Sequence, residues 1–260
     1  MKWLWSEWPQ VEGRIWSSGH TVLLLDYDGT LAPISRVPEE ATVSAPMKSL
    51  LRRLSRSSRV TVALISGRPL ANLRQLVGLR NLTYVGNHGL EMLHQGRRTG
   101  VIVPRFSREA LSRVRPILAS LVKDVPGASL EDKELSLAFH YRRLRASEVA
   151  RLKTGIRLAV LPFVRSGGLS LLNGRKIIEV RPGLNWTKGD AALCLVKRMR
   201  HRRLLPIYIG DDRTDEDAFD VLIDGITIRV GAHHRSKARY YVRNVREVAE
   251  LLEWIADQLA

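Results

Sequence analysis

The sequence has almost no cysteine and no long apolar run. Its single cysteine, Cys194, cannot form a disulfide within the chain, which excludes the disulfide-stapled secreted class. No stretch approaches the ~20 apolar residues that span a bilayer. Residues 1–16 carry charges and a proline where a signal peptide needs an unbroken apolar segment. These absences predict a cytoplasmic protein with no membrane partner.

Acidic residues are also scarce relative to basic ones. The chain has 42 Lys and Arg against 26 Asp and Glu, a formal net charge of +16 at pH 7. Such an excess can indicate nucleic-acid binding, but the basic residues form small separated groups, the densest at residues 197–203. Aromatic residues do not alternate with these groups, and no zinc-finger spacing occurs. We favour a solvated basic surface over a nucleic-acid partner, and we expect a monomer.

Short apolar runs alternate with amphipathic stretches along most of the chain. Five runs rich in Val, Ile and Leu are expected to be buried strands, at residues 21–25, 60–65, 82–86, 206–210 and 226–230. Helical periodicity accompanies them, at residues 45–54, 69–77, 188–199 and 245–258. This alternation predicts an α/β fold with a doubly wound, Rossmann-like parallel sheet.

The middle of the chain departs from this pattern. It combines two amphipathic helices, an alternating strand and a hairpin, at residues 107–122, 146–159, 135–142 and 169–180. The Asn173-Gly174 pair, a strong hairpin signal, predicts the hairpin turn at that point. Because the outer pattern resumes afterwards, we expect a core domain of residues 1–103 and 181–260 with an inserted α+β subdomain of residues 104–180.

Reactive side chains follow directly after the predicted strands. The first strand leads into Asp26, Tyr27 and Asp28, and the strand at 206–210 leads into Asp211 and Asp212. The two strands between them in sequence lead into Ser66-Gly67-Arg68 and Asn87-His88. Ligands of doubly wound sheets bind beyond the carboxyl ends of the strands. We therefore expect these residues to converge on one site.

Asp26 and Asp28, two residues apart at a strand end, suit covalent chemistry on a phosphate. One carboxylate can attack the phosphorus, and the second can protonate the leaving oxygen and later activate water. Two anions facing a phosphate need a cation, and Mg²⁺ prefers oxygen ligands of this kind. Asp211 is the natural further ligand, while Asp212 and Asp215 can hold the surroundings of the metal in place.

The bound anion also needs hydrogen-bond donors. Ser66 offers a hydroxyl and a backbone N–H near a helix start, and Lys188 can bring a positive charge to a phosphate oxygen. Each motif alone has an ordinary structural explanation, such as a turn at residues 26–29 or an acidic helix start at 214–219. Together, on successive predicted strands, they favour a phosphate-processing site.

The chain resembles haloacid dehalogenase-like phosphatases in four strings: DYDGTL, SGR, WTKG and GDDRTDEDAF. More narrowly, it resembles the trehalose-6-phosphate phosphatase family in LISGRP, VGNHGLE, LEDKELSLAFHYR, GRKIIEVRPGLNWTKG and IYIGDDRTDEDAF. These strings cover most of the chain between residues 22 and 219. The resemblance implies a haloacid dehalogenase core and Mg²⁺-dependent hydrolysis of trehalose 6-phosphate to trehalose and phosphate.

The resemblance also implies a role for each matching core residue. Asp26 becomes the nucleophile that forms an aspartyl-phosphate. Asp28 becomes the general acid/base and binds Mg²⁺ through its backbone carbonyl. Asp211 joins these two acids as a protein ligand of the metal, and Ser66 and Lys188 bind the phosphate.

By the same resemblance, the inserted subdomain becomes a cap that closes over the sugar. Charged groups that bond several hydroxyls suit a disaccharide, and the matching positions are Glu131, Lys133, Arg142, Lys176 and Glu179. The core side of the substrate site would consist of Asp26, Tyr27, Asp28, Arg68, Asn87 and His88. A solvated face for the cap residues and a structural role for His88 stay open as alternatives.

Two other functions stay open as well. The same chemistry could act on another sugar or glycoside phosphate, such as sucrose phosphate or mannosylglycerate phosphate, because the cap determines the substrate. A basic nucleic-acid-binding protein on a phosphatase-like fold would show strongly salt-dependent binding, although it would gain nothing from converging acids. Four tryptophans at positions 3, 5, 8 and 16 are expected to pack a short helix onto the core or onto a partner.

Overall fold

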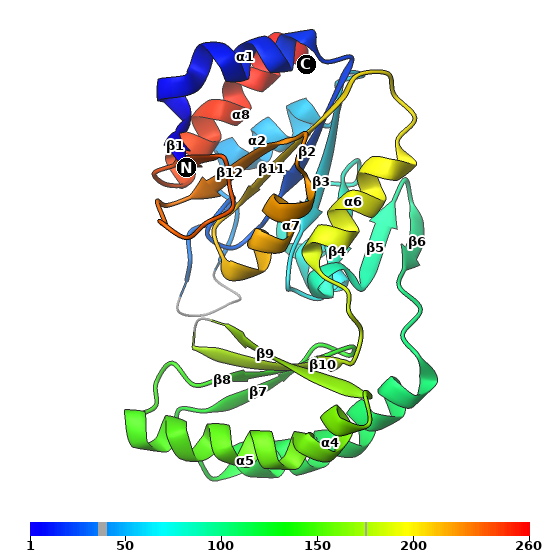
Figure 1. Ribbon diagram of the computed structural model, residues 1–260, viewed down its shortest axis with the longest axis vertical. Helices are drawn as coiled ribbons and strands as arrows, with labels where there is room; N and C mark the ends of the chain where they lie inside the picture. The colour runs from blue at the N-terminus through cyan, green and yellow to red at the C-terminus, as the bar shows by residue number, and fades with distance from the viewer. Residues whose placement is uncertain (36–40, 175) are drawn as a thin grey trace. The chain divides into compact units, whose positions relative to one another are not determined.

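The chain divides into two compact units. A computed structural model describes residues 1–35, 41–174 and 176–260. The first unit comprises residues 1–100 and 186–260, and the second comprises residues 101–185 (Figure 1). These boundaries lie three residues (101 against 104) and five residues (185 against 180) from the expected ones. That the second unit acts as a cap stays a prediction.

A nine-stranded sheet forms the centre of the first unit, in the order β1-β13-β12-β11-β2-β3-β4-β5-β6. The expected strands form at His20–Leu25 (β2), Val60–Ile65 (β3), Thr83–Gly86 (β4), Leu204–Gly210 (β11) and Ile226–Val230 (β12). The strands that the sequence did not predict are Lys2–Trp3 (β1), Glu91–His94 (β5), Arg97–Gly100 (β6) and Tyr240–Val242 (β13).

The strands from β1 to β4 in the sheet order are parallel, whereas β5 and β6 add an antiparallel edge. The prediction of an α/β fold with a mainly parallel sheet is therefore confirmed. The antiparallel edge is a departure from the purely parallel sheet that we expected.

Strand β2 shows why the parallel strands read as continuous apolar runs. All six of its residues are buried. Leu23 and Leu25 belong to one core cluster, and Val22 and Leu24 belong to another on the opposite face. Because successive side chains of a strand point to opposite faces, a strand covered by helices on both sides needs apolar residues at every position.

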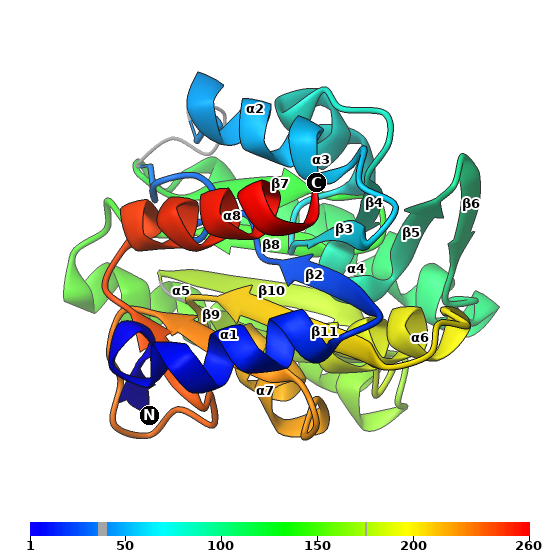
Figure 2. The same ribbon diagram turned by 90° about the horizontal axis from the view of Figure 1, so that it is seen from above.

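Six helices cover the two faces of this sheet. The cluster with Leu23 receives side chains from helices α1 (Trp8–Ser17), α2 (Ala45–Leu54), α3 (Leu70–Val77) and α8 (Val245–Leu259). The cluster with Leu24 receives them from α6 (Lys188–Arg198) and α7 (Glu216–Val221). Figure 2 shows α2 and α8 on one side of strands β2 and β11, with α6 and α7 on the other.

Two of the four tryptophans near the N-terminus, Trp5 and Trp8, pack against this core. The ring of Trp8 meets Trp254 of α8 edge to face, with centroids 4.8 Å apart, and the ring of Trp5 lies 4.8 Å from that of Trp8. The indole N–H of Trp3 donates to Glu247 Oε2 over 3.1 Å. For Trp5 and Trp8 the structure shows the expected packing on the core, whereas Trp16 is 48% exposed.

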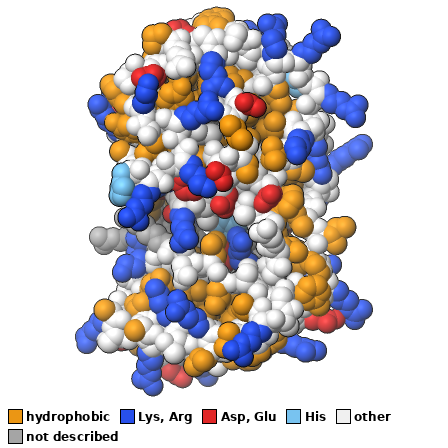
Figure 3. Space-filling model, in the orientation of Figure 1, with side chains coloured by type: hydrophobic (Ala, Val, Ile, Leu, Met, Phe, Trp, Pro, Cys, Tyr) orange, Lys and Arg blue, Asp and Glu red, His pale blue; other side chains and the backbone are white. Residues whose placement is uncertain are grey.

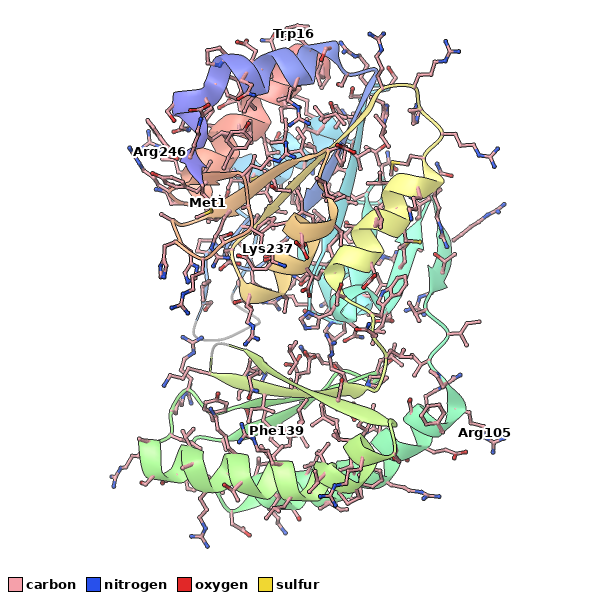
Figure 4. All side chains as sticks on the ribbon, in the orientation of Figure 1. Met1, Trp16, Arg105, Phe139, Lys237 and Arg246 are labelled. Carbon is pink, nitrogen blue, oxygen red and sulfur yellow. The ribbon has the colours of Figure 1, made fainter. Side chains whose placement is uncertain are left out.

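The second unit is a four-stranded antiparallel sheet covered on one face by two helices. Its strands are Ser129–Asp132 (β7), Leu137–His140 (β8), Leu169–Gly174 (β9) and Ile177–Pro182 (β10), in the order β7-β8-β10-β9. Helices α4 (Arg105–Lys123) and α5 (Ala146–Arg165) pack on its apolar face. Phe139 of β8 points toward these helices (Figure 4). Glu131 and Glu179, both paired with Ala138, therefore belong to the opposite, polar face.

The hairpin turn lies later than predicted. Asn173 pairs with Ile178 and Gly174 with Ile177, so both residues of the expected turn belong to β9. The chain reverses after Gly174, where Lys176 has a positive φ of 65°. A turn at Asn173-Gly174 would have set residues 180–182 opposite residues 165–167, which are the end of α5 and the turn after it. The need to pair the whole of β10 outweighs the local turn signal.

None of the helices in the described ranges of the chain is long and apolar enough to cross a bilayer.

Candidate active site

The core residues singled out from the sequence meet at one edge of the first unit's sheet. Asp26, Ser66, Asn87 and Asp211 directly follow strands β2, β3, β4 and β11. These four strands are neighbours in the order β11-β2-β3-β4 and run parallel. Their carboxyl ends therefore lie side by side, as the sequence predicted. Lys188, the first residue of α6, completes the group.

Asp26 lies in a buried network of charges. Its Oδ1 accepts a 2.6 Å hydrogen bond from the Lys188 ammonium, which also donates to Asp215 Oδ1 over 2.9 Å. The Tyr208 hydroxyl donates to the same Asp215 oxygen over 2.8 Å, and the Asp212 N–H donates to Asp215 Oδ2 over 3.0 Å. Asp215 thus holds Lys188 against Asp26, and its expected role beside a metal stays a prediction.

Burial and neighbouring charges both shift the pKa values of this network. Burial raises the pKa of the Asp26 carboxyl well above its usual range; Lys188 opposes the shift, and Asp215 and Asp211 add to it. Burial, with Asp215 and Asp212 nearby, raises the pKa of Asp211 to about 7. Burial disfavours the charged Lys188 ammonium, but Asp215 and Asp26 outweigh burial and raise its pKa. Lys188 is therefore a permanent cation, and the acids compete for protons.

The acids also offer a place for a divalent cation. Asp26, Asp211 and Asp215 each have a carboxylate oxygen within 4.8 Å of the others. Gly29, with φ of +83°, leaves room for Asp211, since a Cβ there would lie 2.3 Å from Asp211 Oδ2. Both oxygens of Asp215 already accept hydrogen bonds. The donor set therefore fits an oxygen-preferring ion such as Mg²⁺ held by Asp26 and Asp211.

Asp28 and Arg68 form a two-point ion pair. Arg68 Nε donates to Asp28 Oδ2 over 2.7 Å, and Nη2 donates to Oδ1 over 2.6 Å. The guanidinium of Arg68 thus lies on Asp28, and the expected contact of Arg68 with the substrate stays a prediction. The side chain of Tyr27 is fully buried, and its hydroxyl donates to Ala41 O over 2.8 Å. As a correction, the buried Tyr27 side chain is not available for substrate contact.

Ser66 belongs to a loop that interlocks with the next strand end. Its Oγ accepts the Arg68 N–H over 3.1 Å. Its own N–H donates to Val85 O over 2.9 Å, so this N–H is used by the sheet and is not the phosphate donor that we expected. His88 N–H donates to Ser66 O over 3.0 Å, and a Cβ on Gly67 would lie 2.5 Å from the His88 ring. The His88 backbone thus links this loop to Ser66, and both roles expected for its side chain stay predictions.

Asn87 is fixed by a residue that the sequence did not single out. Asn87 and His88 both adopt left-handed backbone, with φ of 47° and 56°. The Asn87 amide donates to Glu91 Oε2 over 2.6 Å, and the same oxygen accepts the Leu70 N–H over 3.1 Å. Glu91 thus joins the loop after β4 to the start of α3. Its position in the string VGNHGLE, four residues after Asn87, is the only signal that could have found it.

Tyr208 is a second residue that the sequence analysis missed. It occupies the middle of β11 and is fully buried, and its hydroxyl is bonded to Asp215. Burial, with the nearby charges of Asp215 and Asp26, raises the pKa of Tyr208 well above its usual value, so it acts only as a donor. The sequence signal that could have found Tyr208 is a tyrosine hydroxyl within an apolar strand that leads directly into two acids.

In the second unit, three of the five expected substrate residues are close to one another. Glu179 Oε1 accepts hydrogen bonds from Lys133 Nζ over 3.2 Å and from Ser136 Oγ over 2.7 Å. Burial raises the pKa of Glu131, but its hydrogen bond to His140 and the charge of Lys133 outweigh burial and lower it. Lys133 and Glu179 are only 7% and 3% exposed. For these two residues, the alternative of a solvated face is therefore wrong.

The other two residues, Arg142 and Lys176, are exposed, and Lys176 lies at the tip of the β9–β10 hairpin. Over the face drawn in Figure 3, Lys and Arg side chains are interspersed with hydrophobic ones. This distribution fits the solvated basic surface expected from the sequence.

A family model described as trehalose-phosphatase matches residues 24–246. Among curated proteins, the chain is 32% identical to a trehalose-phosphate phosphatase of Mycolicibacterium paratuberculosis over 92% of this chain and 63% of the relative. It is 31% identical to trehalose-phosphate phosphatase B of Arabidopsis thaliana over 91% of this chain and 66% of the relative. The chain thus spans just under two thirds of the length of these relatives.

Solved structures show the same fold. The C-terminal domain of the C. albicans trehalose-6-phosphate phosphatase superposes with a TM-score of 0.83 at 25% identity, covering 96% of both chains. A trehalose-6-phosphate phosphatase related protein gives a TM-score of 0.77 at 28% identity, covering 91% of this chain and 97% of that one. The family model covers far more than half of the sequence and includes each strand end described above. The chain belongs to the trehalose-phosphatase family.

Proposed function

We propose that this chain hydrolyses trehalose 6-phosphate to trehalose and phosphate, with Mg²⁺ bound and with a phosphoryl group carried on Asp26. The observation that carries the proposal is the buried Asp26 carboxylate at the end of β2, bonded to Lys188 at 2.6 Å beside Asp211. In a chain of the trehalose-phosphatase family, this arrangement supports a nucleophile with its counter-ions in place.

Asp26 opens the reaction. Its Oδ1 is held by Lys188, and its other oxygen attacks phosphorus in line with the sugar oxygen. The new bond joins Asp26 to phosphorus, and the bond from phosphorus to the sugar oxygen breaks. Asp28 gives a proton to that oxygen as it leaves. Mg²⁺, held by the Asp26 and Asp211 carboxylates and the Asp28 carbonyl, would offset negative charge on the phosphate oxygens.

Asp28 also serves the second half of the reaction. Having lost its proton, it takes one from a water whose oxygen attacks phosphorus. The bond between Asp26 and phosphorus then breaks, which restores the carboxylate and frees phosphate. Lys188 has a third ammonium proton beyond the two that bind Asp26 and Asp215, and Ser66 has the proton of a hydroxyl that already accepts a bond. We assign both protons to phosphate oxygens.

The polar face of the second unit is proposed to bind the disaccharide, as a cap. Glu131, Lys133 and Glu179 combine charges of both signs within one cluster, which suits a ligand whose hydroxyls both donate and accept hydrogen bonds. Arg142 and Lys176 are proposed to join them.

The test is phosphate release from trehalose 6-phosphate with and without Mg²⁺, for wild type and Asp26→Asn. Glucose 6-phosphate, sucrose 6-phosphate and p-nitrophenyl phosphate are assayed in parallel. We expect a strong Mg²⁺-dependent preference for trehalose 6-phosphate that Asp26→Asn abolishes. Faster turnover of another sugar phosphate would keep the nucleophile and replace the substrate. Undiminished activity of Asp26→Asn would overturn the mechanism.

A further inference from the structure

The proposed acid/base, Asp28, does not stand alone in the site. Both of its oxygens accept hydrogen bonds from a single guanidinium, at 2.7 Å from Nε and 2.6 Å from Nη2 of Arg68. The Arg68 side chain is 11% exposed, and that of Asp28 is 39% exposed. A two-point contact of this kind fixes the orientation of a carboxylate as well as its distance. The more buried partner therefore sets the position of the more exposed one.

Arg68 is itself held from several sides. Its Nη1 donates to Asn72 Oδ1 over 3.1 Å, and its guanidinium lies 5.3 Å from the centre of the buried Tyr27 ring. Its backbone N–H donates to Ser66 Oγ, and its carbonyl accepts the Asn87 N–H over 2.8 Å. The frame that orients Asp28 thus reaches back through the loops after β3 and β4.

This frame leaves Arg68 few donors for a ligand. Of its five side-chain N–H groups, three are donated to Asp28 and Asn72. Asp28, by contrast, keeps about two of its four lone-pair directions for a proton or a water, since Arg68 uses two. The geometry therefore separates the two residues: Asp28 has room to exchange a proton with a reacting oxygen, and Arg68 is engaged with the protein.

We propose that Arg68 is a positioning residue that acts on the reaction through Asp28, and that it is not a direct contact to sugar or phosphate. The inference rests on the proposed function. Its physical basis is that a misplacement of about 1 Å can cost a reaction about 100-fold. A lone Asp28 side chain with free rotation at its single bonds would spend little time where the leaving oxygen needs it.

If Arg68 acts through Asp28, its replacement should slow only those steps in which Asp28 transfers a proton. Lysine at this position keeps the charge but loses the fork, so it cannot hold both oxygens. Arg68→Lys should lower kcat/KM for trehalose 6-phosphate about tenfold or more. The p-nitrophenolate group leaves without needing a proton. Because kcat/KM reports only the steps up to the first irreversible one, kcat/KM for p-nitrophenyl phosphate should change less than about twofold.

The decisive experiment is a double-mutant cycle with wild type, Arg68→Lys, Asp28→Asn and the double variant. With Asp28 already replaced, we expect Arg68→Lys to cost less than about twofold further in kcat/KM for trehalose 6-phosphate. Asn72→Ala, which loosens Arg68 without altering the ion pair, should produce a smaller loss of the same kind and serves if Arg68→Lys does not fold. Arg14→Gln is the matched control, since Arg14 bonds the carbonyls of residues 224 and 225, before the start of β12.

Three results would overturn the proposal. An Arg68→Lys loss that multiplies with the Asp28→Asn loss would show that Arg68 acts on its own. An equal loss of kcat/KM for both substrates would assign Arg68 to the phosphate that they share. A pure increase in KM for the sugar substrate would assign it to the sugar. Failure of the proposed function is seen separately, in the wild-type substrate profile and in Asp26→Asn.

Discussion

Lys188 is the only cation bonded to either of two buried carboxylates in the described part of the site, and its removal should destabilise the first unit strongly. In Lys188→Met, the side chain keeps a similar length and loses its charge. Asp26 and Asp215, now bonded at 2.6 Å and 2.9 Å to the same ammonium, would be left facing each other. All three side chains are almost completely buried, so water offers them no compensation.

The size of the loss follows from this geometry. Breaking a buried ion pair by removing one partner costs about 3–5 kcal/mol, because a charge stays buried without its counter-charge. The upper part of this range is expected, because one ammonium serves two acids. The loss should grow as the pH rises. Burial already raises the pKa of Asp26, and a carboxyl with a raised pKa in the folded state loses stability when it must give up its proton.

Urea denaturation followed by tryptophan fluorescence measures this loss directly. All six tryptophans belong to the first unit, so the signal reports that unit alone. Lys237→Met is the matched control, because Lys237 pairs with Asp220 at an exposed site and its removal should leave the transition unchanged within error.

A loss below about 1 kcal/mol at pH 8 would refute this account of the network, because such a value is typical of exposed pairs. A loss that is the same at pH 5 and pH 8 would also refute it, since the unpaired acids would then not be titrating.

Three further predictions concern other parts of the molecule. Burial raises the pKa of Asp211 to about 7, so Mg²⁺ affinity, measured calorimetrically, should fall about tenfold per pH unit below that value as the metal competes with a proton; a flat profile would contradict this. Glu179→Gln weakens the bond to Lys133 and should raise KM for trehalose 6-phosphate about tenfold. The KM for p-nitrophenyl phosphate should not change. An equal rise in KM for both substrates would show that Glu179 does not bind the sugar. Burial and His201 lower the pKa of His20. The stability that neutral His20 contributes is therefore complete above pH 6.5 and should decline as the pH falls. His20→Gln should make the melting temperature less dependent on pH between pH 5 and 7, as thermal melts would show.

The sequence predicted the framework of the site because that framework depends on strand order alone. The strands β3 and β12 and the helix α2 begin and end where the apolar patterns do. For α2, the Ser44 hydroxyl accepts the Met47 N–H at its start. Once the strands are parallel, the acids at their carboxyl ends must share an edge.

Contacts between loops were beyond the reach of the sequence. The pairing of Arg68 with Asp28 joins residues 40 positions apart, and it depends on how the loop after β3 is bent by hydrogen bonds from the loop after β4. No periodicity encodes that bend. Strand β6 was not predicted for a different reason. Its residues RRTG are all exposed, so they show no hydrophobic pattern. They form a strand only because they pair with β5.

The charged residues of strand β6 protect an exposed edge of the sheet. Strand β6 is the last in the sheet order and carries Arg97 and Arg98, both exposed. An edge strand offers unpaired backbone groups to any other extended chain, and charged side chains are a common protection against such pairing. Two copies meeting edge to edge here would bring four guanidinium groups together. The arginines thus oppose pairing of this strand with the same strand of another molecule. Mutation of both to alanine should promote aggregation through this edge.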